Sequence, residues 1–296
     1  MQNQPYSYEV EKLRLPDGSQ IAYREFGEGE ASLLLLHGLG SYLPVWDKMR
    51  PHLEKDFKCV VLDLPGFGQS STVSGPISIE FFAKQIEAFV HQKKLKNLSL
   101  IGHSMGGQIA MRLCLNQSID LQSLILLAPA GIERFSQAEG DQLKQFVTPA
   151  SVLAQTEEQI TQNFAINFYG NQLPEDASFM VQDRLALKGD SSHYASFAKV
   201  FPASMTAMLD GPVYEELDQI KIPVLVLFGA DDQLIPNRFL HPDLSIADVA
   251  KMAERLIPSA EVKLLEQCGH FVPWDQAERV SENIRRFTQS TQIIAP

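Results

Sequence analysis

The sequence of 296 residues has few cysteines and no long apolar run. Its three cysteines, Cys59, Cys114 and Cys268, are too few and too scattered for a disulfide framework or a metal-binding knuckle. Apolar runs such as 121–131 are far shorter than the roughly 20 residues that span a bilayer. The first residues, Met-Gln-Asn-Gln-Pro, lack the basic and apolar regions of a secretory signal. These absences predict a cytoplasmic protein without a membrane span.

Positive charge is also scarce. Lysine and arginine number 25 against 36 acidic residues, for a net charge of −11. A nucleic-acid partner is therefore not expected, because phosphate binding requires a basic surface. The glycines of 102–107 do not have the spacing of a dinucleotide fingerprint, and no metal-ligand cluster is visible. We expect a small-molecule substrate, no cofactor and no metal; the oligomeric state, monomer or homodimer, stays open.

Short apolar runs alternate with helix-periodic segments over most of the chain. An opening hairpin is expected at 9–15 and 20–26, joined by a Pro-Asp-Gly turn. Further strands are expected at 32–37, 59–64, 97–102, 121–127, 223–229 and 261–265. Helices are expected at 45–53, 79–90, 105–116, 246–256 and 276–287. This order is typical of an α/β fold with a mostly parallel sheet flanked by helices.

The alternation stops between about Glu133 and Gly211, where only helical patterns occur. A helical block at this place predicts a cap, because it directly follows the carboxyl end of a strand, where ligands bind in open α/β sheets. We therefore predict a core of residues 1–132 and 212–296 and an inserted, all-helical cap of residues 133–211. The alternative is that the block thickens one face of the sheet.

The segment Gly102-His103-Ser104-Met105-Gly106 fits the pattern G-x-S-x-G. A strand is expected before it and a helix after it, which is the context in which this pattern forms a sharp turn around a nucleophilic serine. The flanking glycines let the strand and helix pack closely, and the helix N-terminus directs backbone N–H groups toward the serine. Ser104 is therefore the candidate nucleophile; the alternative is a glycine-rich turn without chemistry.

A nucleophilic serine needs a general base, and the chain offers seven histidines. His270 follows the last strand, where a loop can bring an imidazole over the strand ends, and it is the best candidate by position. His103 should point away from the Ser104 oxygen, and His37 should brace its own loop. The remaining four are expected at the surface: His52, His91, His193 and His241.

The base needs an acid to orient it, and the penultimate strand is followed by two, Asp231 and Asp232. The segment that contains them is Gly229-Ala230-Asp231-Asp232-Gln233-Leu234-Ile235-Pro236. With this segment added to the motif of Ser104, the chain resembles the α/β-hydrolase superfamily of serine hydrolases. The resemblance covers nearly all of the chain outside the predicted cap. Its G-x-x-D-x-x-x-P pattern implies that Asp232 is the acid, and the order Ser, Asp, His agrees.

The same resemblance implies further roles. The segment His37-Gly38-Leu39-Gly40 is similar to the family's oxyanion loop, which implies that the backbone N–H groups of Leu39 and Met105 hold the oxyanion. The segment beginning at Asp63 resembles the family's D-x-x-G-x-G-x-S turn, and Asp63 is expected to be structural. The implied mechanism is acylation of Ser104 and hydrolysis of the acyl-enzyme by water that His270 activates.

The predicted cap is rich in phenylalanine, which indicates a mostly apolar pocket. Helical spacing such as Phe197, Phe201, Met205 and Met208 is more often that of the core of the cap than of a pocket, so each of these residues is expected in that core. Five cations of the cap could anchor a carboxylate or be solvated: Arg134, Lys144, Arg184, Lys188 and Lys199. Arg238 and His241, in the long loop after Asp232, could also reach the site.

These features favour a hydrolase of a small, mostly apolar ester, lactone or thioester. One alternative is a hydrolase of carbon–carbon bonds in ring-cleavage products. Relatives with that activity usually have Asn at the position of His103, Trp at that of Phe271, and more glycine and proline in the oxyanion loop. Acyl transfer or perhydrolysis would use the same residues. A further alternative is a receptor or signalling module that retains the triad, because fold does not imply function.

Overall fold

Within the residues that the computed structural model describes, residue 6 and residues 8–294, eight strands form one sheet in the order β1-β2-β4-β3-β5-β6-β7-β8. The strands are β1 (Glu11–Arg14), β2 (Gln20–Phe26), β3 (Ala31–Leu36), β4 (Phe57–Leu62), β5 (Leu98–His103), β6 (Leu121–Leu127), β7 (Val224–Gly229) and β8 (Ala260–Leu265). The β1–β2 and β2–β4 pairs are antiparallel, and all other pairs are parallel. The mostly parallel sheet and the opening hairpin are thus confirmed.

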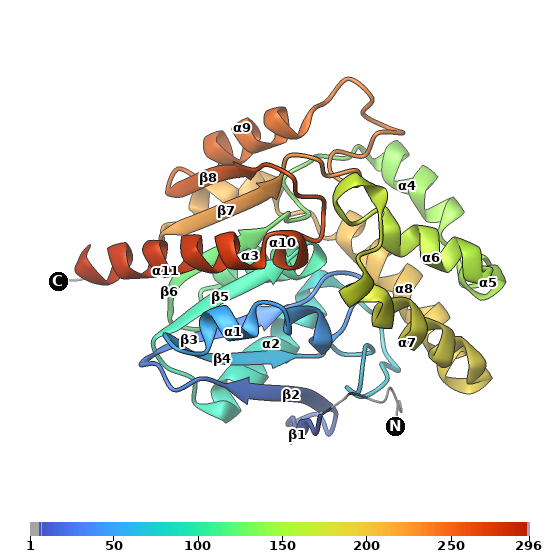
Figure 1. The fold of residues 1–296 in the computed structure, drawn as a ribbon, viewed down its shortest axis with the longest axis horizontal. Coiled ribbons are helices and arrows are strands. Elements are labelled where there is room, and N and C mark those ends of the chain that lie inside the picture. The colour runs from blue at the N-terminus through green and yellow to red at the C-terminus, as the bar shows by residue number, and fades with distance from the viewer. Residues whose placement is uncertain (1–5, 7, 295–296) are drawn as a thin grey trace.

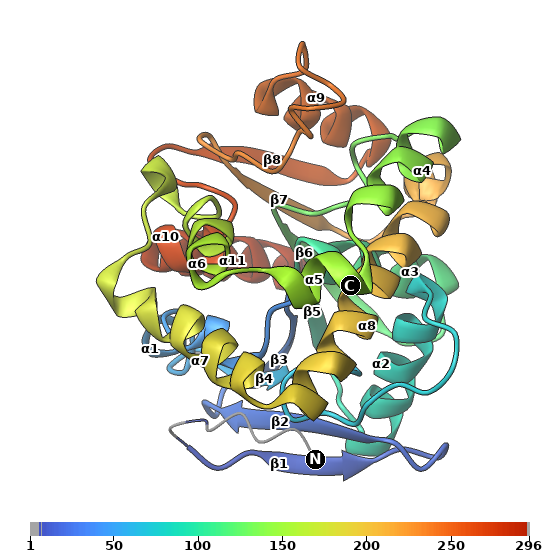
Figure 2. The same cartoon turned by 90° about the vertical axis from the view of Figure 1, so that its right-hand side faces the viewer.

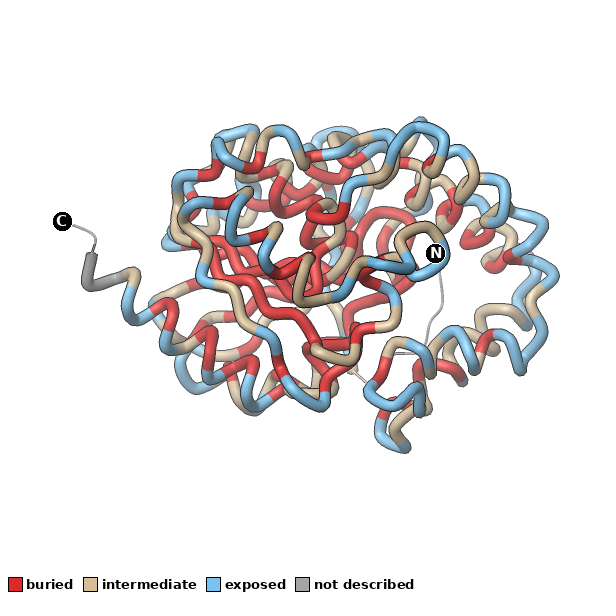
Figure 3. Tube along the Cα trace, turned by 90° about the horizontal axis from the view of Figure 1, so that it is seen from above, coloured by how far each residue is buried: buried red, intermediate tan, exposed pale blue. Residues whose placement is uncertain are grey.

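Helices cover both faces of the sheet (Figure 1). On one face α2 (Ile79–Lys93) packs against α3 (Met105–Asn116), and on the other α1 (Arg50–Leu53) packs against α11 (Ala277–Ile294). Helix α9 (Ile246–Leu256) packs against β7 and β8, and the short α10 (Val272–Asp275) against α11. Strands β3 to β7 are almost entirely buried, as their continuous apolar runs require (Figure 3).

Residues between β6 and β7 are helical, as predicted. The five α-helices there are α4 (Gln137–Phe146), α5 (Pro149–Ala154), α6 (Glu157–Ala165), α7 (Ser178–Gly189) and α8 (Ser191–Asp210). Short 3-10 turns separate them at η2 (Tyr169–Asn171) and η3 (Glu175–Ala177), and η4 (Tyr214–Gln219) leads back to β7. These helices pack mainly on one another and lie at one end of the sheet (Figure 2).

The prediction of one helix at 45–53 is wrong. The structure has instead a 3-10 turn, η1 (Leu43–Trp46), and the four-residue α1 (Arg50–Leu53). Pro51 lies in the first turn of α1 and has no N–H with which to continue a helix from the preceding residues. None of the helices in the described part of the chain is long and apolar enough to cross a membrane.

Candidate active site

Ser104 lies at the apex of the turn between β5 and α3. Its φ of 52° and ψ of −118° are a conformation that residues with a side chain rarely adopt. A β-carbon on Gly102 would lie 2.4 Å from the carbonyl oxygen of Gly106, and one on Gly106 would lie 2.2 Å from that of Leu36. The strand, the helix and β3 pack this closely only because both positions are glycine. The structure thus has the sharp strand-to-helix turn that the sequence predicts.

His270 and Asp232 form a buried pair. His270 Nδ1 lies 2.8 Å from Asp232 Oδ2, and their side chains are 4% and 0% exposed. The other carboxylate oxygen accepts hydrogen bonds from the backbone N–H groups of Leu234, at 2.8 Å, and Ile235, at 3.0 Å. The carboxylate is therefore fixed, and it holds the imidazole by Nδ1. This leaves His270 Nε2 available on the side of the ring away from Asp232.

Ser104 and His270 line the same cavity, at the carboxyl ends of the parallel strands. Asp231 does not belong to the pair, because His270 Nδ1 is bonded to Asp232; the backbone N–H of Asp231 donates to the carbonyl oxygen of Cys268 and braces the loop. The structure thus places Ser104 and His270, which follow β5 and β8, at one cavity, and Asp232, which follows β7, in contact with His270. Their roles as nucleophile, base and acid stay predictions.

Two other histidines are buried structural residues. His103 Nε2 donates to the backbone carbonyl oxygen of His270 at 2.8 Å, and burial lowers the pKa of His103 to about 3. His37 Nε2 accepts from the N–H of Leu64 at 2.9 Å, while its Nδ1 donates to the carbonyl oxygen of Gly38. Burial lowers the pKa of His37 to about 4. The expected bracing role of His37 is confirmed.

The predicted oxyanion loop passes directly over the turn of Ser104. A β-carbon on Gly38 would lie 3.1 Å from Ser104 Cβ, and Leu39 lines the cavity. Met105 is the first residue of α3, where backbone N–H groups have no partner within the helix. These positions suit two N–H donors beside the serine; that Leu39 and Met105 hold an oxyanion stays a prediction.

Asp63 has the structural role expected of it. Its carboxylate accepts from the N–H of Leu43 at 2.7 Å and from that of Gln69 at 2.8 Å, and also from the hydroxyl of Tyr6 at 2.6 Å. Complete burial raises its pKa to about 6 despite these bonds. The residue ties the turn after β4 to the segment after the oxyanion loop and does not line the cavity.

The cavity has a volume of about 690 Å³. The turn of Ser104 and the oxyanion loop form one wall, and the inserted helices form another. Apolar side chains from those helices that line it include Phe146, Ile160, Phe164, Phe197, Phe201 and Met205. The expectation that the phenylalanines and methionines of α8 form only the core of the cap is wrong, because Phe197, Phe201, Met205 and Met208 all line the cavity.

Arg184 of α7 is the one cation among the five considered that lines the cavity. Its guanidinium donates to the carbonyl oxygen of Gly40 and lies 4.0 Å from the ring centroid of Phe197. Its Nε has no hydrogen-bond partner within the described residues. Burial lowers the pKa of Arg184 to about 10, so it still carries a full positive charge at neutral pH. The sequence gives no local signal that distinguishes it from the other cations.

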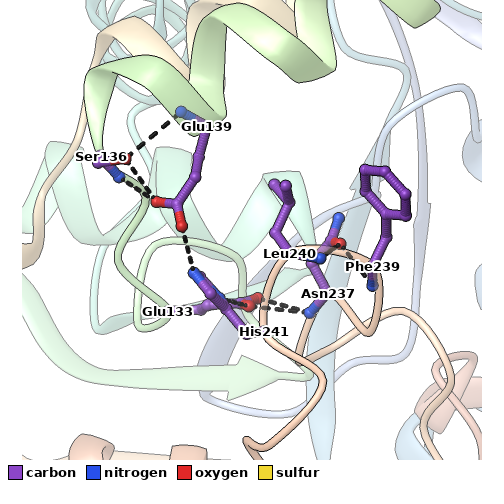
Figure 4. Close-up of polar contacts among 7 residues, drawn as sticks. All are labelled: Glu133, Ser136, Glu139, Asn237, Phe239, Leu240 and His241. Carbon is purple, nitrogen blue, oxygen red and sulfur yellow. Dashed lines mark hydrogen bonds and ion pairs between the residues drawn. The ribbon is translucent and has the colours of Figure 1, made fainter.

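His241, which was expected at the surface, is only partly exposed. Its side chain is 20% exposed and lies between two carboxylates, with Nδ1 2.5 Å from Glu133 Oε1 and Nε2 3.3 Å from Glu139 Oε1 (Figure 4). Glu133 is nearly buried and also accepts from the N–H of Asn237, and its pKa is raised by burial. The network ties the start of the inserted helices to the loop that follows Asp232. Glu133, the nearest acid after β6, thus pairs with His241 and not with His270.

No group of three or more histidine, cysteine or acidic side chains is arranged to hold a metal ion, as far as residue 6 and residues 8–294 are concerned. The polar groups of the cavity include the Ser104 hydroxyl and the His270 imidazole. The fold and this site together define the class of the protein.

A family model described as the alpha/beta hydrolase fold matches residues 31–277. The chain therefore belongs to the α/β-hydrolase fold family, and it is a hydrolase of this fold. The match extends from β3 to the start of α11 and thus includes the segments of Ser104, Asp232 and His270.

Two curated relatives and one solved structure illustrate the range of similar proteins. The chain is 27% identical to the human monoacylglycerol lipase ABHD6, over 88% of this chain and 75% of the relative. It is 24% identical to a 2-hydroxy-6-oxononadienedioate/2-hydroxy-6-oxononatrienedioate hydrolase of Paraburkholderia phymatum, over 90% of each chain. A probable hydrolytic enzyme of Pseudomonas aeruginosa has the same fold, with a TM-score of 0.80 and 22% identity, over 95% of this chain and 94% of that one.

Proposed function

We propose that the protein is a serine hydrolase that forms an acyl-enzyme from a small, mostly apolar ester, lactone or thioester. The observation that supports this most is the fixed His270–Asp232 pair, because its imidazole lines the same cavity as the strained Ser104. A buried carboxylate that holds an imidazole by Nδ1 is the arrangement that turns Nε2 into a general base. The apolar wall formed by the inserted helices suits an apolar substrate.

The proposed reaction has two stages. Ser104 Oγ attacks the carbonyl carbon while His270 Nε2 takes its proton, and Asp232 stabilises the imidazolium that forms. The N–H groups of Leu39 and Met105 hold the oxyanion, each contributing on the order of 3 kcal/mol to the lowering of the barrier. The proton passes from His270 to the leaving group. A water molecule, deprotonated by His270, then attacks the acyl carbon. The bond to Ser104 Oγ breaks, His270 returns the proton to this oxygen, and the acid product leaves.

The helical block of residues 133–211 acts in this proposal as a cap over a core of residues 1–132 and 212–296. It supplies most of the apolar cavity wall, and residues near both of its ends contact the core, at α3 and at the loop after Asp232. The name of the human relative, a monoacylglycerol lipase, is consistent with the proposal that the substrate is an ester with an apolar acyl part.

A second candidate is hydrolysis of a carbon–carbon bond in an acidic substrate. The observation that favours it is Arg184, a charged group in the cavity wall without a carboxylate partner among the described residues. The Paraburkholderia relative is named as a hydrolase of such diacids. Against it, His103 and Phe271 stand where relatives with that activity usually have Asn and Trp.

The test uses a fluorophosphonate probe and p-nitrophenyl esters of increasing chain length on the wild type and on Ser104→Ala. We expect labelling and turnover in the wild type and neither in the variant. Labelling without ester turnover would support the second candidate, which ring-cleavage dienoates would then test directly. A folded wild-type protein that is not labelled would refute the proposal.

A further inference from the structure

Large apolar side chains are exposed at the mouth of the cavity. Phe146, Ile166 and Leu234 line the cavity and are also exposed to solvent. Phe239, which is 69% exposed, lies edge-on to Phe146 with ring centroids 6.4 Å apart. We call these four residues the mouth rim. They are four of the seven large apolar side chains that are exposed in the described part of the chain, so their gathering at one opening calls for an explanation.

The turn that presents Phe239 is anchored by polar contacts. Asn237 Oδ1 accepts from the N–H of Phe239 at 3.1 Å and from that of Leu240 at 3.0 Å. Glu133 accepts from the N–H of Asn237 and pairs with His241, so both ends of the turn are fixed (Figure 4). The Phe239 ring points away from this network, and it is therefore held at the surface instead of folding into the cavity.

The charges near the mouth rim argue against a surface of anionic phosphates. Residues 137–168, which contribute α4 to α6, hold four acidic residues and one basic residue, Lys144. Lys144 is itself paired with Asp141 and Asp210. Arg238, the exposed cation of the neighbouring loop, donates a hydrogen bond to a backbone carbonyl oxygen. Acidic residues thus outnumber basic ones near the rim, and the chain as a whole has a net charge of −11, which does not favour binding to anionic phosphates.

From these observations we infer that the mouth rim docks on a neutral, zwitterionic lipid surface, from which the substrate enters the cavity directly. The rim is continuous with the cavity, so an acyl chain could pass from the lipid to Ser104 without crossing water. Aromatic and aliphatic side chains that enter the boundary between head groups and acyl chains bind by burial of apolar area. The source of the substrate rests on the proposed function, whereas the docking itself does not.

Docking is tested by flotation of the Ser104→Ala protein with phosphatidylcholine vesicles, because this variant leaves the lipid intact whatever the reaction. We expect vesicle binding that persists at 0.5 M salt and does not increase when anionic lipid is added. Adding Phe239→Ser should lower the partition coefficient on the order of tenfold. The matched control is Leu264→Ser, which alters an exposed apolar residue on β8, outside the rim, and should leave binding unchanged.

Activity provides the second measurement. Phe239 does not line the cavity, so Phe239→Ser in the active protein should keep its rate on a water-soluble p-nitrophenyl ester and lose rate on the same ester group embedded in vesicles. Absence of flotation, or equal flotation with Phe239→Ser, would overturn the inference. Dimerisation that Phe239→Ser abolishes, without vesicle binding, would assign the rim to a second copy of the chain instead. Flotation of Ser104→Ala, together with a folded wild type that the fluorophosphonate probe does not label, would refute only the proposed function.

Discussion

His103 Nε2 donates a hydrogen bond of 2.8 Å to the backbone carbonyl oxygen of His270. The residue next to the candidate nucleophile thus holds the backbone of the candidate base. The centroids of the two imidazole rings lie 5.1 Å apart, so a positive charge on His103 would oppose protonation of His270. Burial prevents this, because it lowers the pKa of His103 to about 3.

This burial predicts that the protein loses stability in mild acid. The unfolded chain takes up a proton on His103 near its ordinary pKa of about 6.5, whereas the folded protein does so only near 3. The stability contributed by the neutral ring is therefore present above pH 6.5 and lost as the pH falls, by about 1.4 kcal/mol per unit. Denaturant unfolding measured between pH 7 and 4.5 should show that the free energy of unfolding declines less steeply for His103→Asn than for the wild type. Parallel curves for the two proteins would contradict the prediction.

The second prediction separates the two neighbouring acids. Asp232→Asn should lower kcat on a p-nitrophenyl ester on the order of 10⁴-fold, because the amide can no longer hold His270 in the productive tautomer. Asp231→Asn is the matched control, and its kcat should stay within a few fold of the wild-type value. Steady-state kinetics of both variants measures these effects, and circular dichroism checks that both are folded. The reverse order of the two effects would show that the acid has been wrongly assigned.

The third prediction concerns Arg184, which donates to the Gly40 carbonyl oxygen in the oxyanion loop. We expect Arg184 to serve mainly to position that loop, so that Arg184→Met lowers kcat/KM on the order of tenfold, and equally for a neutral p-nitrophenyl butyrate and for a p-nitrophenyl hemisuccinate. Exposed Lys199→Met, on the next helix, is the control and should change neither rate. A loss confined to the hemisuccinate would instead identify Arg184 as a carboxylate anchor and favour the second candidate function.

Local patterns explain why much of the fold could be predicted. The helix at 105–116 and the strand at 121–127 have the predicted bounds, because their apolar periodicity is set within each segment. The turn of Ser104 was visible for the same reason, since both required glycines lie within two residues of it. At 45–53 the sequence does contain a signal against one continuous helix, because Pro51 interrupts the apolar pattern.

Contacts between distant segments could not be predicted in the same way. His241 pairs with Glu133, which is 108 residues away, and nothing adjacent to either residue marks the pair. Arg184 reaches Gly40 across 144 residues, and in sequence it resembles any cation on a helix. Its burial follows from how α7 packs against the oxyanion loop, which is a property of the assembled fold.

The last prediction concerns the His241 pair. In His241→Ala the carboxylate of Glu133, which is 7% exposed, keeps only the Asn237 N–H as a partner among its described contacts, and a nearly buried carboxylate that loses a hydrogen bond is destabilising. We expect the free energy of unfolding to fall by about 2 kcal/mol, and the loop of Phe239 to become susceptible to proteolysis. The double variant Glu133→Gln/His241→Ala should regain part of this loss, because it removes the unpaired charge as well. Equal stability of the single and double variants would mean that the pair contributes packing only, and the turn would then be held by Asn237 alone.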